Sequence, residues 1–295
     1  MSRAALSPLP EHLSANRCRV LARRIAEAHR TIDAASLLAF SSTGSNDGSI
    51  GQAPEVELCI AFRWMPIEAR LADACTRGGA GAWLHSEGAS SGGRFSVQCR
   101  SDGIGVRIGY FDHQALNDAL DATLAEHGAA AARQGFGRSI LNAEPLAGHA
   151  ELARLQARLT RLTPKVACAM VKRFLSTPTP WRAISQIGER DAALWCRELQ
   201  VDACYRLCGV RAALSQRYFT RFQVKRQPQR APRFENAPAG LGERIERLMQ
   251  ARPREAFAQL FALEGEVLAM VAREMPQINL ATVQASRAAY GRALA

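Results

Sequence analysis

Two glutamates separated by one residue, Glu55 and Glu57, are the side chains best suited to chemistry in this sequence. They alternate with apolar residues, as in a strand, where residues two apart project from the same face. The small, flexible pair Gly44-Ser45 precedes them, with nine residues between. Two carboxylates on one face, opposite a Gly-Ser turn, can hold a divalent metal ion and a triphosphate.

The elements that must position these residues follow from the apolar pattern of the first 112 residues. We expect a helix, two strands, a second helix, a short strand and a hairpin, because period-two alternation indicates strands and three-four spacing indicates helices. In chain order these are 16–35, 39–42, 55–62, 66–76, 82–86, and the hairpin of 94–100 with 104–111. The sequence thus predicts a small mixed sheet with helices on one side.

The remainder of the chain reads as helices and loops. Pro164 interrupts an apolar stripe and is expected to separate two helices. The expected helices are 115–126, two over 150–175, 189–219, 241–250 and 254–274, and 135–148 is expected to be a connector. We therefore predict an α+β protein with a sheet domain over 1–128 and an all-α domain over 129–295. Trp181 and Trp195 are expected in the core of the helical domain.

Composition describes an ordinary globular protein, with 47% hydrophobic and 22% charged residues among 295. No apolar run approaches the roughly 20 residues that span a bilayer. The first ten residues lack the pattern of a signal peptide, so we expect a cytoplasmic protein without membrane contact. Eight scattered cysteines without a CxxC pair are expected to be buried free thiols.

The net charge of +11 favours an anionic partner, such as a nucleotide, an RNA or an acidic protein. Only three of the 38 basic residues are lysines, so the charge also fits a genome rich in arginine codons. No aromatic-rich strand or other RNA-binding signature accompanies it.

The order helix, strand, Gly-Ser, nine residues and acid-apolar-acid-apolar resembles the DNA polymerase beta-like nucleotidyltransferase superfamily. Thr43-Gly44-Ser45 and Glu55-Val56-Glu57-Leu58 carry the resemblance. A sheet domain followed by a helical domain is also similar to the antibiotic nucleotidyltransferases. The resemblance covers about 110 residues with motif support.

This resemblance implies transfer of a nucleoside monophosphate from a nucleoside triphosphate to a hydroxyl of a small molecule, protein or RNA. Magnesium would be held by Glu55 and Glu57, and the triphosphate by Gly44 and Ser45. Lys225 lies past the long helix, where relatives place a phosphate-binding lysine; the alternative is a solvated loop charge.

Three departures from the family pattern leave a second hypothesis open. Both motif acids are Glu, the Arg-Gly that often follows the Gly-Ser pair is missing, and Arg107 stands where the third acid is expected. A guanidinium beside two glutamates can replace the metal by an ion pair. The chain would then be a catalytically degenerate scaffold that binds a nucleotide or a protein. Alternatively, Glu55 and Glu57 form the solvent face of an edge strand, unrelated to any site.

Overall fold

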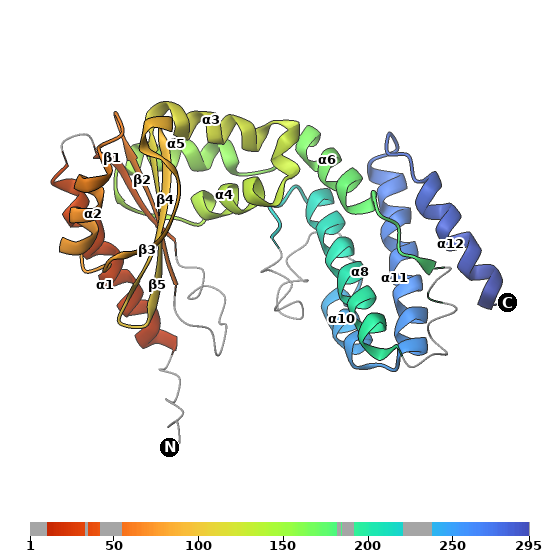
Figure 1. The fold of residues 1–295 in the computed structure, drawn as a ribbon. Coiled ribbons are helices and arrows are strands. Elements are labelled where there is room, and N and C mark those ends of the chain that lie inside the picture. The colour runs from red at the N-terminus through yellow and green to blue at the C-terminus, as the bar shows by residue number, and fades with distance from the viewer. Residues whose placement is uncertain are drawn as a thin grey trace, which may run out of the picture. The chain divides into compact units, whose positions relative to one another are not determined.

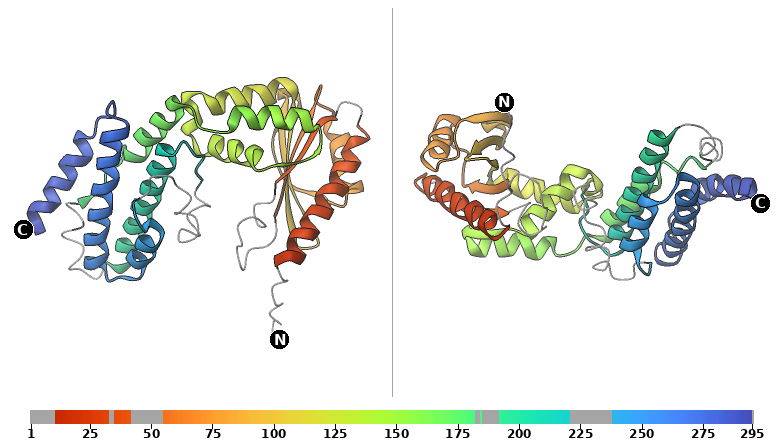
Figure 2. Two further views of the ribbon diagram at one scale, coloured as in Figure 1. Left: turned by 180° about the vertical axis from the view of Figure 1, so that it is seen from behind. Right: turned by 90° about the horizontal axis from the view of Figure 1, so that it is seen from below.

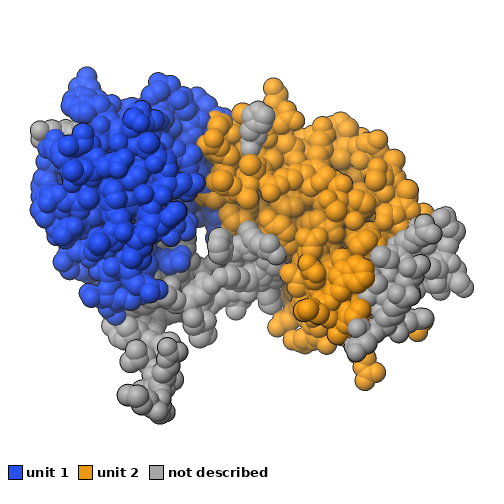
Figure 3. Space-filling view, viewed as in Figure 1, with its two compact units in different colours: residues 1–121, 136–160 blue, residues 122–135, 161–295 orange. Residues whose placement is uncertain are grey.

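The computed structural model describes residues 11–32, 35–41, 55–181, 184, 192–220 and 238–294. The chain forms two compact units, coloured separately in Figure 3. Unit 1 comprises residues 1–121 and 136–160, and unit 2 comprises residues 122–135 and 161–295. The fold is α+β, as predicted, with a mixed sheet in unit 1 and helices in unit 2. The division into folding domains after residue 128 stays a prediction.

Unit 1 is built on a six-stranded sheet with the order β3-β4-β5-β2-β1-β6 (Figure 1). The strands are β1 (Ala35–Ser41), β2 (Glu55–Phe62), β3 (Trp83–Ala89), β4 (Arg94–Ser101), β5 (Ile104–Asp112) and β6 (Glu144–Ala147). β2 and β5 are parallel, whereas the other neighbours are antiparallel. Each strand predicted in the first 112 residues has a counterpart, but β1 begins at Ala35, at the end of the segment expected to be helical. β6 is an additional strand in the expected connector.

Helices α1 (Glu11–Arg30) and α2 (Glu68–Arg77) cover one face of this sheet. The alternate residues Val56, Leu58, Ile60 and Phe62 of β2 are buried there. Their period of two puts the intervening residues, including Glu55 and Glu57, on the opposite face. The same alternation that suggested the strand therefore decides which side chains remain outside this core.

A chain of polar groups crosses the core beneath α1 and α2. His29 Nδ1 donates a 2.7 Å hydrogen bond to the carbonyl of Ile25. Tyr110 Oη lies 2.9 Å from His29 Nε2 and 3.0 Å from Cys75 Sγ. Burial raises the pKa of Tyr110 well above its usual value, so its hydroxyl stays protonated.

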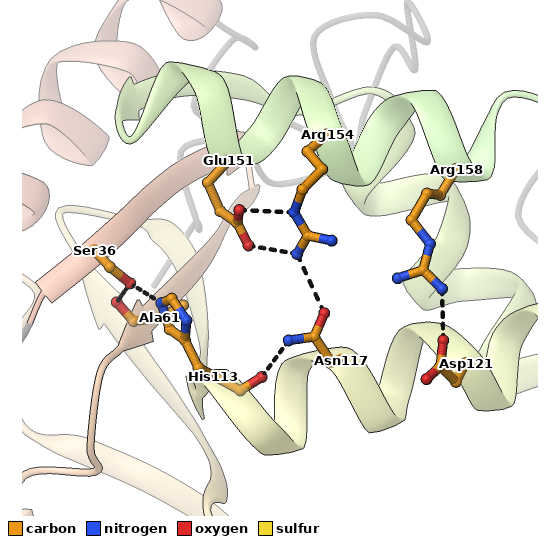
Figure 4. Close-up of polar contacts among 8 residues, drawn as sticks. All are labelled: Ser36, Ala61, His113, Asn117, Asp121, Glu151, Arg154 and Arg158. Carbon is orange, nitrogen blue, oxygen red and sulfur yellow. Dashed lines mark hydrogen bonds and ion pairs between the residues drawn. The ribbon is translucent and has the colours of Figure 1, made fainter.

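The opposite face is also covered in part, which corrects the prediction of helices on one side only. Three further helices contribute residues to unit 1: α3 (His113–Leu124), α4 (Ala131–Leu141) and α5 (His149–Leu159). Figure 4 shows how α3 is attached: Ser36 Oγ of β1 lies 2.7 Å from His113 Nε2. Leu37 and Ala39 of β1 are buried on this side.

Ion pairs join α3 to α5 on the outer surface of unit 1. Arg154 donates two hydrogen bonds, of 2.7 and 2.9 Å, to Glu151 and a third to Asn117 (Figure 4). Arg158 donates a 2.6 Å hydrogen bond to Asp121. The Arg154 guanidinium lowers the pKa of Glu151, mainly through these hydrogen bonds. Both arginines of α5 thus have acidic partners.

Unit 2 is a helical assembly in which α8 packs against α6, α10 and α11 (Figure 2). Its helices include α6 (Pro164–Leu175), α8 (Ala193–Leu214), α10 (Leu241–Gln250), α11 (Pro253–Glu274) and α12 (Ala281–Leu294). Pro164 begins α6, and the Thr163 side chain caps it, as expected for a break at this proline. Trp181 is fully buried, but Trp195 is 50% exposed, so the prediction for Trp195 was wrong.

Two findings concern the chain as a whole. All eight cysteines are free thiols, and six of them are buried. Among the described residues, no helix combines the length and apolarity required to cross a membrane.

Candidate functional site

The strand that carries the two glutamates lies inside the sheet, between β1 and β5. Every residue of β2 has a partner in β5. The interpretation of Glu55 and Glu57 as the solvent face of an edge strand is therefore wrong. Ser41, the last residue of β1, pairs with Glu57. The C-terminal end of β1 therefore lies beside the N-terminal, acidic end of β2.

The two carboxylates differ in their surroundings although they share a face. Glu55 is exposed at the start of β2, whereas the Glu57 side chain is only 20% exposed. Ser139 of α4 donates a 2.9 Å hydrogen bond to Glu57 Oε2. A polar side chain thus holds one oxygen of the inner carboxylate from the helix above the sheet.

Arg107 is the neighbour of Glu57 on the adjacent strand. Because β2 and β5 run parallel with Glu57 and Arg107 in register, both side chains project from the same face. Arg107 Nη1 lies 3.6 Å from Glu57 Oε1. The sequence placed Arg107 at the third-acid position, and the structure brings it beside the motif.

A second arginine contributes to the electrostatics of this site. Arg138 precedes Ser139 on α4, and burial lowers its pKa, while the charge of Glu57 opposes that shift. Glu57 therefore lies in the field of two guanidinium groups, Arg107 and Arg138. Sequence reasoning missed Arg138 and Ser139, since Gly135 and Gly137 weaken the helical pattern of a segment that was expected to be a connector.

Two aspartates near the ends of β5, Asp102 and Asp112, do not contribute to this site. Asp112 Oδ1 accepts a 2.7 Å hydrogen bond from the backbone N–H of Ala115 and so caps α3. Asp102 lies in the hairpin turn with a φ of 47°. Neither takes the in-register place beside Glu57, which Arg107 holds.

Three predicted site residues, Gly44, Ser45 and Lys225, lie outside the described residues. Their expected roles at the triphosphate stay predictions. Glu55 and Glu57 are described, and their shared face is confirmed by the register of β2.

Among the described residues, the donor set does not complete the magnesium site that the resemblance implies. Magnesium requires near-octahedral oxygen coordination, and the in-register neighbour of Glu57 is a cation. Within the described part of the chain, no three His, Cys, Asp or Glu side chains gather in a way that holds a metal ion. What the described residues form instead is a carboxylate bound by Arg107 and Ser139.

Comparison with known proteins gives limited information. No protein-family model matches the chain, and no curated protein matches it. A crystal structure of a nucleotidyltransferase-like protein from Exiguobacterium sibiricum 255-15 is similar over 91% of this chain and 77% of its own, with 12% sequence identity and a TM-score of 0.37. A likeness of this degree carries no argument for an activity.

Proposed function

We propose that this chain is a catalytically degenerate nucleotidyltransferase-like protein that acts as a nucleotide-binding scaffold without magnesium. The observation that supports the proposal is the ion pair of Arg107 with Glu57, at the position where the family pattern has a third acid. The cation neutralises the carboxylate that the metal would otherwise need. Magnesium-dependent transfer of a nucleoside monophosphate is the competing hypothesis.

Phosphate is the ligand group that this arrangement favours. A guanidinium has five N–H donors, and the 3.6 Å contact with Glu57 is longer than a hydrogen bond. The Arg107 side chain is 59% exposed, so a ligand in solution can reach it. A nucleotide phosphate can therefore bind to Arg107 on the open part of the sheet face, in the fork geometry that suits phosphate oxygens.

Calorimetric titration of each nucleoside triphosphate, with magnesium or with EDTA, tests the proposal. We expect at least one triphosphate to bind with an affinity that magnesium does not change. Arg107→Ala should weaken binding by about tenfold or more, the loss typical of a charge-assisted hydrogen bond. Arg70→Ala, an exposed arginine on α2 at the other face of the sheet, is the matched control and should change nothing.

A transfer assay with labelled triphosphates separates the two hypotheses. Magnesium-dependent product that disappears in Glu57→Ala would establish the enzyme and overturn the scaffold. Failure of every triphosphate to bind would also reject the proposal.

A further inference from the structure

The net positive charge of the chain falls entirely on one of its two compact units. Counted over the sequence, unit 1 has 15 arginines against 15 acidic residues, whereas unit 2 has 23 basic residues against 12 acidic ones. The net charge of unit 2 is therefore +11, equal to that of the whole chain. We therefore expect a polyanionic partner to be attracted to the helical unit more strongly than to unit 1, whose formal net charge is zero.

Part of this excess lies around α6. No aspartate or glutamate occurs between Glu151 and Glu189, and the part of this stretch that belongs to unit 2 has five arginine and lysine residues. Arg161, Lys165 and Lys172 are exposed, as is Arg173, which donates a hydrogen bond to the carbonyl of Ala129. Within the described part of the chain, none of the first three forms an ion pair or a side-chain hydrogen bond, in contrast to the arginines of α5.

The geometry of α6 presents two of these cations, Lys165 and Lys172, as one stripe, and Arg161 lies three residues before the helix begins. Lys165 and Lys172 are seven residues apart, so they share a helix face at a separation of about 10 Å along the axis. Between them on this face lie the small, partly buried residues Cys168 and Ala169. The opposite face is fixed in the core of unit 2 by its apolar residues Val166, Ala167, Met170, Val171 and Phe174.

We propose that the α6 stripe, defined as Arg161, Lys165 and Lys172, binds the phosphate backbone of a duplex nucleic acid without reading its sequence. Lys165 and Lys172 on a rigid helix, with Arg161 just before it, offer unpaired cations to successive phosphates, and the small residues between the lysines permit close approach. The stripe has no aromatic side chain, whereas proteins that bind single strands use aromatic side chains as stacking platforms. The inference is independent of the nucleotide site in unit 1.

Fluorescence anisotropy with a labelled 20-base-pair DNA duplex, measured between 50 and 200 mM KCl, tests the stripe. Each phosphate contact contributes about −0.9 to the slope of log K against log salt. The triple variant Arg161→Gln, Lys165→Gln, Lys172→Gln should therefore make the slope shallower by about 2.7. The control Arg23→Gln, Arg63→Gln, Arg70→Gln removes the same charge from exposed positions of unit 1 and should leave the slope unchanged.

Cys168 supplies a second readout that needs no variant. Alkylation of this partly buried thiol, followed by mass spectrometry, should slow several-fold when the duplex is bound, because Cys168 lies between the two lysines. Equal slope changes in the triple variant and its control, unaltered alkylation, or tighter binding of the single strand would each overturn the proposal. Loss of binding by the triple variant on phosphatidylserine vesicles but not on the duplex would likewise reject it in favour of a membrane surface.

Discussion

Arg107 and Glu57 occupy paired positions on neighbouring parallel strands, and their charged groups lie 3.6 Å apart on the same face of the sheet. The pair is half-exposed on the arginine side, where a contact of this kind contributes at most about 1 kcal/mol to stability. Its importance is therefore chemical rather than structural. Carboxylates gathered at one place repel each other, and a bound metal ion relieves that repulsion. A guanidinium at this position relieves it without a metal ion.

Arg107→Asp should convert this site from metal-excluding to metal-binding. The substitution exchanges a positive for a negative charge beside Glu57, and we expect manganese, a magnesium substitute, to bind about tenfold or more tightly than to the wild type. Titration with manganese, followed by electron paramagnetic resonance, measures the gain. Arg94→Asp makes the same exchange on the same face, about 13 Å further along the sheet, and should produce no comparable gain.

Tyr110→Phe should reduce the free energy of unfolding by about 2 kcal/mol, because it leaves His29 and Cys75 buried without their shared partner. Tyr218→Phe is the matched control, since the buried hydroxyl of Tyr218 has no hydrogen-bond partner among the described residues. Its removal should be neutral or stabilising. Urea denaturation of both variants tests the pair, and equal losses would show that the chain from His29 to Cys75 adds no stability.

Substitution by alanine should change the free energy of unfolding in opposite directions at Gly209 and Gly135. A Cβ at Gly209 of α8 would lie 2.4 Å from the ring of Phe174, so Gly209→Ala should destabilise by about 1–3 kcal/mol despite its better helix propensity. A Cβ at Gly135 of α4 meets nothing within 4 Å, and Gly135→Ala should stabilise by about 0.5–1 kcal/mol. Thermal unfolding distinguishes them, and a stabilised Gly209→Ala would contradict the close packing of α8 on α6.

These glycines illustrate what the sequence could and could not predict. The reason for Gly209 is the close approach of Phe174, which comes from another helix and leaves no local signal in the sequence. The residues of β2 were predicted to their ends because acid and apolar side chains alternate there. Its place inside the sheet could not be predicted, since pairing with β5 depends on contacts across about 50 residues.

Only the part of the site that lies on the strands could be predicted, because its residues follow a local pattern. Glu55, Glu57 and Arg107 were identified by residue type and spacing. Arg138 and Ser139 were not, because the glycines of α4 weaken its helical pattern in the sequence. The helix α12 was missed, and Trp195 was assigned to the core because its spacing on α8 matches the buried Ala203 and Leu207. Periodicity identifies a possible apolar face, but only tertiary packing decides which part of that face is covered.

A buried carboxylate in unit 2 provides the largest expected change in stability. Glu264 of α11 is 4% exposed and accepts hydrogen bonds of 2.7 to 2.8 Å from Thr179, Trp181 and Arg287. The Arg287 side chain, on α12, is only 15% exposed. One carboxylate therefore joins α11 to α12 and to the segment before residue 182.

Glu264→Gln should lower the free energy of unfolding by about 3 kcal/mol, because it leaves the Arg287 charge without its counterion in a poorly solvated place. Glu266→Gln on the same helix is the matched control. Glu266 forms two 2.7 Å hydrogen bonds with Arg244 but is 47% exposed, so its loss should cost less than about 1 kcal/mol. Denaturation monitored by the fluorescence of Trp181 would show the difference, and similar losses for both variants would mean that burial does not strengthen the Glu264 cluster.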